Sequence, residues 1–285
     1  MNSTEFIDEV LADEKFADGF EDMYIDFQEY QRKAIETLNE FHRVCEKNNV
    51  TYQLAYGSLL GAIRDNGQIP WDYDIDVFVP FSEKNELITA LKKDLSKDYY
   101  FYCPEVDKKC RHVIMRLAPK GYRTEVLHVD VFYLTAVSDS EKERNDEINQ
   151  IKSIASKRYD KLVKYFDEKK SFKNKIRKFI NKIKTLNYNA DKMYVDYEAI
   201  CSRHAMDEYK YLVSADSFAD DYLFPSDIFN NTKLITTDLG TFRIPEKYDE
   251  ILKIQYGDYM KIFPLEERVN EMMNSYERLK RYAKK

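Results

Sequence analysis

Three aspartates at every second position dominate the chemistry that this sequence could perform. Asp72, Asp74 and Asp76 lie in "WDYDIDVFVP", whose other residues are typical of a β-strand, although aspartate itself is depleted in strands. Residues i and i+2 of a strand share a face, so Asp74 and Asp76 should point the same way with Cα atoms roughly 6.6 Å apart. Two carboxylates this close repel each other unless a cation lies between them. We therefore predict a metal site, with Mg²⁺ as the expected ion and Mn²⁺ as the alternative, because such ions are held by carboxylates, water and substrate phosphates.

The alternative interpretation of these aspartates is a charged edge strand, since edge strands often carry charge that prevents aggregation. Lysine is the more usual residue in that position, and an edge strand requires no glycine-serine turn upstream. We therefore favour the metal site. Asp72, which lies beside the loop residues Pro70 and Trp71, is predicted to support the two ligands.

Gly57 and Ser58 stand between a short predicted strand, "VTYQLAY", and a short predicted helix, "LLGAIR". Backbone N–H groups at the start of a helix form a ready binding site for phosphate. Gly57 would let the backbone approach closely, and Ser58 can cap the helix or bind a phosphate oxygen. An ordinary turn could contain the same pair, so the prediction of phosphate binding depends on the Asp-x-Asp strand that follows.

Asp130 is the candidate for a third carboxylate, which would share the metal or take the proton from an attacking hydroxyl. It lies in the middle of the apolar strand predicted over "EVLHVDVFYLTAV", where an aspartate without a partner would be costly. We predict that Asp74, Asp76 and Asp130 form the catalytic and metal-binding set. His128 shares the face of Asp130, and both a place in the site and a structural role are open for it.

The remaining elements predict an α+β fold. A helix with one apolar stripe runs from about Tyr24 and ends at "KNN", where asparagine can adopt the left-handed conformation. After the acidic strand come a helix capped by Ser82, two strands, a charged helical stretch from 138 to about 210, a hairpin in "KLITTDLGTFRIP" and two C-terminal helices. We predict a mixed β-sheet flanked by helices over residues 1–137, and a mainly helical part with the hairpin over 138–285.

The composition excludes several classes of protein. The chain has 285 residues, of which 34% are charged, and a net charge of −6, which argues against a protein that coats nucleic acid. The N-terminal "MNSTEFIDEVLADEKF" lacks the apolar core of a signal peptide, and no run reaches the roughly 18 apolar residues of a membrane span. The four cysteines are therefore expected to be free thiols. We expect a cytoplasmic protein.

Three segments resemble the LicD family of the nucleotidyltransferase-fold superfamily, to which fukutin and fukutin-related protein are related. "YGSLLGAIRDNGQIPWDYDIDVFVP" is similar to the family signature, whose usual form is Gly-Gly/Ser-Thr/Ser-Leu-Leu-Gly-Ala-x-Arg followed by Pro-Trp-Asp-Asp-Asp-Ile-Asp. "LHVDVFYL" resembles its His-x-Asp-x-Phe strand, and the segment ending in "YGDYMKIFP" resembles its closing segment. One departure is Tyr73, which replaces the middle aspartate; its side chain should point away from Asp74 and Asp76, so the chemistry should survive.

The resemblance implies a Mg²⁺-dependent phosphotransferase with a nucleotidyltransferase core. Family members use a CDP-activated alcohol, best known as CDP-choline. They move the phospho-alcohol group to a sugar hydroxyl of a teichoic acid, capsule or lipopolysaccharide precursor and release CMP. By position, the family's site residues fall on Asp74, Asp76 and Asp130 for the metal and on Gly57, Ser58 and Arg64 for phosphate.

Several weaker signals leave alternatives open. "KKSFKNKIRKFINKIK", residues 169–184, predicts a basic amphipathic helix, which would either dock on an anionic membrane near a lipid-linked glycan or pack against the core. Cys103, Cys110 and His112 are too widely spaced for a typical zinc site. The aromatic residues over 98–103 fit a protein core at least as well as a cage for a quaternary ammonium group. The roles of Tyr256, Asp258 and Tyr259 in the closing segment do not follow from the sequence.

Two other functions remain open at this point. The protein could be a nucleotidyltransferase that adds NMP to a small molecule or RNA and releases pyrophosphate. It could also be a non-catalytic protein that binds a nucleotide or a glycan, although the three intact aspartates argue against this.

Overall fold

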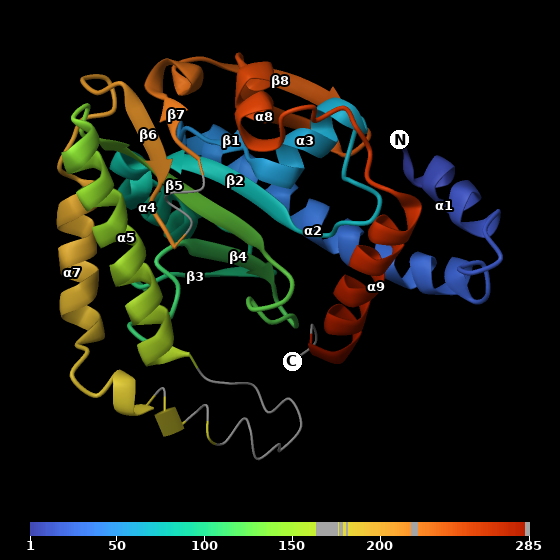
Figure 1. Ribbon diagram of the computed structural model, residues 1–285, viewed down its shortest axis with the longest axis horizontal. Coiled ribbons are helices and arrows are strands. Elements are labelled where there is room, and N and C mark those ends of the chain that lie inside the picture. The colour runs from blue at the N-terminus through green and yellow to red at the C-terminus, as the bar shows by residue number, and fades with distance from the viewer. Residues whose placement is uncertain (164–175, 177–178, 181, 218–221, 283–285) are drawn as a thin grey trace. The chain divides into compact units, whose positions relative to one another are not determined.

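The computed structural model covers residues 1–285 and describes all of them except 164–175, 177–178, 181, 218–221 and 283–285 (Figure 1). The chain groups into two compact units, which combine residues 1–101, 116–131 and 227–285 in the first and residues 102–115 and 132–226 in the second. The predicted boundary after residue 137 divides the chain into two continuous stretches, whereas each observed unit combines segments that are distant in the sequence.

A β-sheet organises the first unit, with strands in the order β1-β2-β5-β4-β3. The strands are Gln53–Leu54 (β1), Ile75–Pro80 (β2), Tyr99–Tyr102 (β3), Met115–Pro119 (β4) and Val129–Val137 (β5). β1 and β2 are antiparallel, with Leu54 opposite Val77. Because β2 and β5 are neighbours, the strand that contains Asp76 lies next to the strand that contains Asp130. Together with the helices, this sheet confirms the predicted α+β class.

Helices pack around this sheet in the first unit. They are Ser3–Leu11 (α1), Phe20–Asn48 (α2), Tyr56–Arg64 (α3), Lys84–Asp94 (α4), Tyr248–Tyr256 (α8) and Leu265–Tyr282 (α9). α2 contacts β2 and α4 and buries the predicted apolar stripe, which includes Phe27, Ala34 and Leu38. It ends at Asn49, whose φ of 55° is the predicted left-handed stop. α3 contacts both β2 and α8, so it lies between the acidic strand and the C-terminal part of the chain (Figure 1).

The local predictions were confirmed in part. The predicted hairpin consists of Thr232–Thr237 (β8) and Gly240–Pro245 (β9); its turn, predicted over Asp238 to Gly240, lies at Asp238 and Leu239. The predicted cap at Ser82 is wrong: Phe81–Glu83 form a 3₁₀ turn, and α4 follows with no side-chain cap. The strand β3 was not predicted, because its four aromatic residues show no alternation of apolar and polar positions. Another 3₁₀ turn is formed by Ser226–Phe229.

The second unit contains the later residues of β5. Its described helices are Glu141–Leu162 (α5) and Ala190–Cys201 (α7), and its short strands are Tyr211–Ser214 (β6) and Phe224–Pro225 (β7). α5 packs along α7, and β6 pairs antiparallel with β5 (Figure 1). The fully buried Arg158 of α5 donates hydrogen bonds to the carbonyl oxygens of Lys108, Cys110 and Ala190. These hydrogen bonds join α5 to two other segments and give the guanidinium N–H groups acceptors. The burial of the charged side chain is therefore tolerated.

The predicted basic helix over 169–184 lies largely outside the described residues, so its contact with a membrane stays a prediction. The described members of its apolar face, Ile176, Phe179, Ile180 and Ile183, are exposed. Within the part of the chain that the structure describes, no helix combines the length and the apolar character needed to cross a membrane.

Candidate active site

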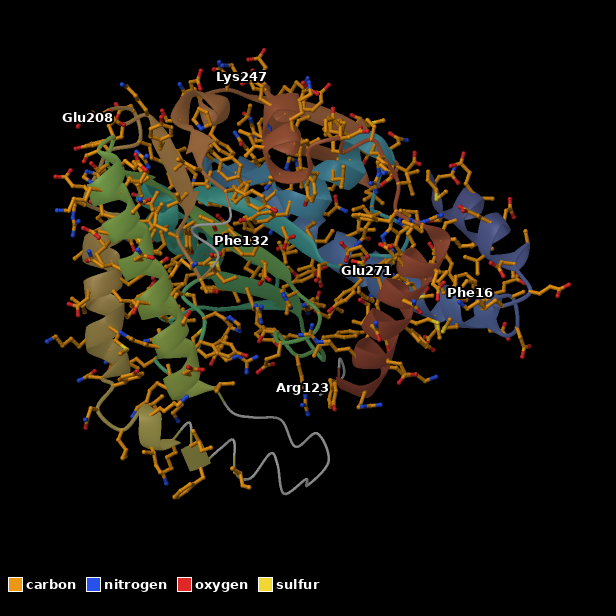
Figure 2. All side chains as sticks on the ribbon, in the orientation of Figure 1. Phe16, Arg123, Phe132, Glu208, Lys247 and Glu271 are labelled. Atoms are coloured by element: carbon orange, nitrogen blue, oxygen red, sulfur yellow. The ribbon has the colours of Figure 1, made fainter. Side chains whose placement is uncertain are left out.

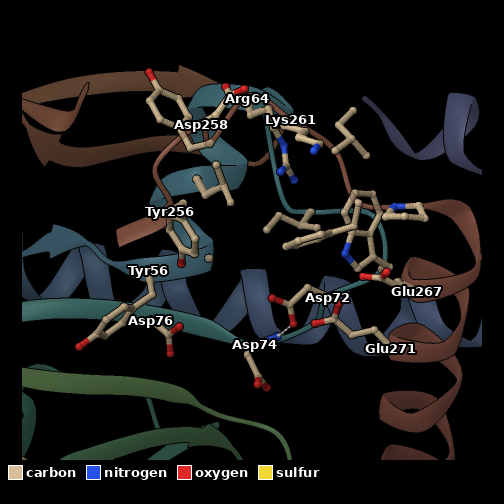
Figure 3. A pocket seen from close by; sticks show the side chains of 18 residues that line it. Tyr56, Arg64, Asp72, Asp74, Asp76, Tyr256, Asp258, Lys261, Glu267 and Glu271 are labelled. Carbon is tan, nitrogen blue, oxygen red and sulfur yellow. Dashed lines mark hydrogen bonds between the residues drawn. The ribbon is translucent and has the colours of Figure 1, made fainter. Parts of the chain in front are cut away.

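A pocket of about 760 Å³ lies in the first unit and is walled by residues that the sequence places far apart (Figure 3). The start of α3 and the segment from Ile69 to Asp76 form one side. Tyr256, Lys261 and their neighbours form another part of the wall, and Glu267 and Glu271 of α9 complete it. The closing segment of the sequence is therefore part of the pocket.

The three alternating aspartates all line this pocket. β2 begins at Ile75, so Asp76 lies in the strand, whereas Asp72 and Asp74 lie in the segment that leads into it. The intervening residues point into the core: Ile75 and Val77 are buried, and the ring of Tyr73 packs edge-on against Phe27, with centroids 6.4 Å apart. The replacement of the family's middle aspartate by Tyr73 therefore extends the core.

The carboxylates of the acidic segment have no ion-pair partner among the described residues. Burial raises the pKa of Asp72 to about 6, and the charge of Glu271 adds to this. Asp74 keeps contact with solvent, yet crowding by protein atoms, followed by the charge of Asp72, raises its pKa to about 6. Burial and then the charges of Asp130 and Asp74 hold the pKa of Asp76 well above its ordinary value. Oxygen donors whose charges are uncompensated in this way fit a hard divalent cation such as Mg²⁺.

Asp130 is in a different electrostatic state. Arg116 of β4 donates from Nε to Oδ1 at 2.7 Å, and His128 Nε2 lies 3.1 Å from Oδ2. Burial alone would raise the pKa of Asp130, but the charges of Arg116 and His128 outweigh burial and hold that pKa below its ordinary value. Nδ1 of His128 is buried and has no hydrogen-bond partner.

The predicted set of three carboxylates is close enough to interact electrostatically, since Asp130 acts on the pKa of both Asp74 and Asp76. Among the residues with a described placement, however, no three acidic, histidine or cysteine side chains converge on one metal position. The assignment of Asp74, Asp76 and Asp130 as joint metal ligands therefore stays a prediction that rests on their donor chemistry.

Gly57 and Ser58 position the acidic segment. A Cβ atom at Gly57 would lie 3.2 Å from Asp72 Oδ2, so a glycine lets this carboxylate approach the start of α3. The hydroxyl of Ser58 accepts a hydrogen bond of 2.9 Å from the backbone N–H of Asp76. α3 begins at Tyr56, whose φ of 43° is unusual for a bulky residue, and no side chain caps its first turn. The predicted contact of its N–H groups with phosphate stays a prediction.

The loop before the acidic segment is held from two sides. A Cβ atom at Gly61 would lie 2.6 Å from the carbonyl oxygen of Gly67, so α3 and this loop can pack this closely only at a glycine. From α2, Gln31 Nε2 donates to the carbonyl oxygen of Asp72 at 2.6 Å, and the hydroxyl of Tyr24 donates to that of Pro70 at 2.9 Å. The position of Asp72 is thus set by backbone contacts on both sides.

Arg64, which the family resemblance placed at phosphate, lines the pocket but is already paired. Its Nη2 donates to Asp65 Oδ2 at 2.8 Å, and both side chains are almost completely buried. Its guanidinium lies over the ring of Trp71, 5.6 Å from the centroid, and Arg268 of α9 lies over the same ring at 5.3 Å. Arg64 therefore helps to fix Trp71 in the pocket wall, and its contact with phosphate stays a prediction.

The sequence analysis missed several residues that shape the site. Arg116 faces Asp130 across neighbouring strands, and opposite charges on predicted adjacent strands were a signal that could have found it. Lys261, Glu267 and Glu271 carried no such signal, because nothing local relates them to residues almost 200 positions earlier.

The raised pKa values predict how the stability of the metal-free protein depends on pH. A carboxyl whose pKa rises from 3.8 to about 6 on folding binds its proton more tightly in the folded state. Raising the pH through this window therefore lowers the free energy of unfolding. In EDTA, we expect urea unfolding followed by Trp71 fluorescence to have a higher midpoint near pH 5 than near pH 7.5. Mg²⁺ should raise the midpoint mainly at the higher pH.

The matched control is the protein with Asp72→Asn and Asp74→Asn together. Its midpoint should depend less on pH and respond less to Mg²⁺. An unchanged dependence in this variant would contradict the assignment of the pH effect to these two carboxyls.

Comparison with known proteins is consistent with this geometry. Residues 49–164 match the family described as LicD/FKTN/FKRP, nucleotidyltransferase domain. This part of the chain is a LicD-family domain. The family predicted from the sequence is thereby confirmed, and the domain contains the acidic segment, Arg116, His128 and Asp130.

The chain as a whole is also similar to curated proteins. It is 27% identical over 260 residues to the lipopolysaccharide cholinephosphotransferase LicD of Haemophilus influenzae, a match that covers 85% of this chain and 94% of that protein. Two uncharacterized proteins match short segments. The protein of Rickettsia typhi is 38% identical over 50 residues, which is 16% of this chain and 16% of that protein. The protein of Rickettsia prowazekii is 35% identical over 52 residues, which is 18% of this chain and 20% of that protein.

Proposed function

We propose that this protein transfers phosphocholine from CDP-choline to a sugar hydroxyl of a cell-surface glycan precursor and releases CMP. The observation that carries the proposal is the pocket in which Asp72, Asp74 and Asp76, all within the LicD-family domain, present carboxylates without ion-pair partners among the described residues beside the start of a helix. The similarity to the cholinephosphotransferase of Haemophilus influenzae along most of both chains supports the choice of phosphocholine.

In this reaction, the acceptor hydroxyl oxygen forms a bond to the phosphorus that carries choline. The bond from that phosphorus to the CMP oxygen breaks, CMP keeps the electron pair, and the hydroxyl proton passes to water. Phosphoryl transfer of this kind depends on positioning and charge neutralisation more than on covalent catalysis. A site with carboxylates, N–H groups and a cation, and with no cysteine or serine nucleophile, is therefore sufficient.

Asp74 and Asp76 would hold Mg²⁺, and Asp130 would complete the set. The ion would neutralise charge on the diphosphate as the bond to CMP breaks. Because Asp130 is already paired with Arg116 and His128, it is a weak base, so we assign it to charge compensation and not to proton removal. Lys261 and the N–H groups at the start of α3 would contact the donor phosphates, since both lie in the pocket wall.

Release of CMP from CDP-choline tests the proposal directly. With Mg²⁺ and lipopolysaccharide as the acceptor, the protein should release CMP and label the glycan with choline. CDP-choline at about 100 times its Kd should stabilise the folded protein by about 2.7 kcal/mol, and CDP-glycerol, CDP-ribitol and ATP should stabilise it less. Stabilisation by CTP with release of pyrophosphate would instead indicate a nucleotidyltransferase, and binding without turnover would indicate a non-catalytic protein.

A further inference from the structure

The α9 wall of the pocket carries negative charge that the proposed metal site does not require. Glu267 and Glu271 are four residues apart on α9, so they share one face of the helix, and both line the pocket. Figures 2 and 3 show Glu271 on the side of α9 that faces the acidic segment. Like charges at this spacing repel each other, so a cation bound beside both carboxylates would relieve this repulsion.

The described side chains leave these two carboxylates without an ion-pair partner. Neither glutamate forms an ion pair with any residue that the structure describes. Burial and then the charge of Asp74 raise the pKa of Glu271, and no basic side chain opposes this. Of the two basic residues in the pocket wall, Arg64 is already paired with Asp65.

The same wall offers exposed aromatic surface. Phe263 lies two residues before the start of α9 and lines the pocket with 56% of its surface exposed. Arg268 of α9 fixes its backbone by donating to its carbonyl oxygen at 2.7 Å. Tyr256 lines the pocket from the adjoining segment and is 37% exposed. Aromatic faces exposed in the same pocket as carboxylates without ion-pair partners suit an organic cation, which binds through charge and through contact with aromatic rings.

We infer that Glu267, Glu271 and Phe263 form the subsite for the trimethylammonium group of choline. This inference rests on the proposed function and deepens it, because it assigns the recognition of the transferred alcohol to α9. A trimethylammonium group has no N–H donor, so it can be selected only by charge and by contact with apolar or aromatic surface. Lys261 and the start of α3, which also line the pocket, remain for the phosphates.

The test compares choline with its neutral isostere, in which a tert-butyl group replaces the trimethylammonium group. CMP release is measured from CDP-choline and from CDP-3,3-dimethylbutanol in the wild type, Glu271→Gln, Glu267→Gln and Phe263→Leu. Glu277→Gln is the matched control, because Glu277 lies on the same helix, is exposed and is outside the pocket lining. We expect Glu271→Gln to lower the preference for choline roughly tenfold while the neutral donor changes by less than about twofold.

Calorimetric binding of phosphocholine and of 3,3-dimethylbutyl phosphate provides a readout that does not depend on turnover. Phosphocholine should bind more weakly to Glu271→Gln and unchanged to Glu277→Gln. If Glu271→Gln lowered CMP release equally with both donors, or needed a higher concentration of Mg²⁺ with both, the subsite would be overturned in favour of a metal-binding role. If the wild type binds phosphocholine through Glu271 but releases no CMP, the subsite stands and the proposed reaction fails.

Discussion

The Asp76→Asn protein is expected to fold normally and to lose phosphotransfer activity by roughly 10³-fold, because several kcal/mol of charge stabilisation correspond to about three decades in rate. Asparagine keeps the shape of the side chain and leaves the backbone hydrogen bond to Ser58 intact. It removes a carboxylate that burial and the charges of Asp130 and Asp74 disfavour. The free energy of unfolding at neutral pH should therefore stay the same or increase, while CMP release falls.

This variant is informative because its activity should fall while its free energy of unfolding is unchanged or higher. A residue that merely supported the fold would lose both together. Asp227→Asn is the control, because Asp227 pairs with Lys247 at the surface, outside the pocket lining, and should leave CMP release unchanged. Full activity of Asp76→Asn would refute the assignment of the acidic segment as the catalytic site.

The second large effect is expected for Arg116→Met. Removing one partner of a buried ion pair leaves the other charge uncompensated, which typically costs 3–5 kcal/mol. Arg116 and Asp130 are 12% and 15% exposed, and His128 remains beside Asp130, so we expect a loss of about 3 kcal/mol in the free energy of urea unfolding at pH 7. Trp71, the single tryptophan of the chain, lies in the same unit and reports the transition by its fluorescence.

The pH dependence of this loss has a definite sign. A carboxyl whose folded-state pKa is depressed contributes stability above its ordinary pKa of 3.8, and that contribution disappears as the pH falls through the folded-state value. The difference between the wild type and Arg116→Met should therefore be largest at neutral pH and should shrink below about pH 4. A constant difference across this range would contradict the role of the Asp130 charge.

A second variant keeps this prediction testable if Arg116→Met fails to fold. In the protein with both Arg116→Met and Asp130→Leu, no unpaired charge of this pair is left in the sheet. Replacing both members of a buried pair by apolar residues is often neutral, so the double variant should recover most of the lost stability. It should not recover activity, because Asp130 is gone.

The sequence predicted features whose causes are local. The apolar stripe of α2 and its stop at Asn49 follow from helical periodicity and from the left-handed preference of asparagine. The hairpin around Asp238 to Gly240 follows from its turn residues. The acidic residues stood out because their chemistry contradicts their setting in an apolar strand. The Ser82 cap failed because a 3₁₀ turn at Phe81–Glu83 intervenes, and such end geometry depends on packing.

What the sequence by itself determined is the α+β class, the family and the identity of the acidic residues in the pocket. Only the tertiary structure decided the partners of the charged residues: Arg64 pairs with Asp65, Asp130 pairs with Arg116, and Asp76 has no ion-pair partner among the described residues. It also decided that α9 forms a wall of the pocket with Glu271. The physical reason is that periodicity and turn preference act over a few residues. Charge compensation and cavity shape, in contrast, depend on which distant segments the fold brings into contact.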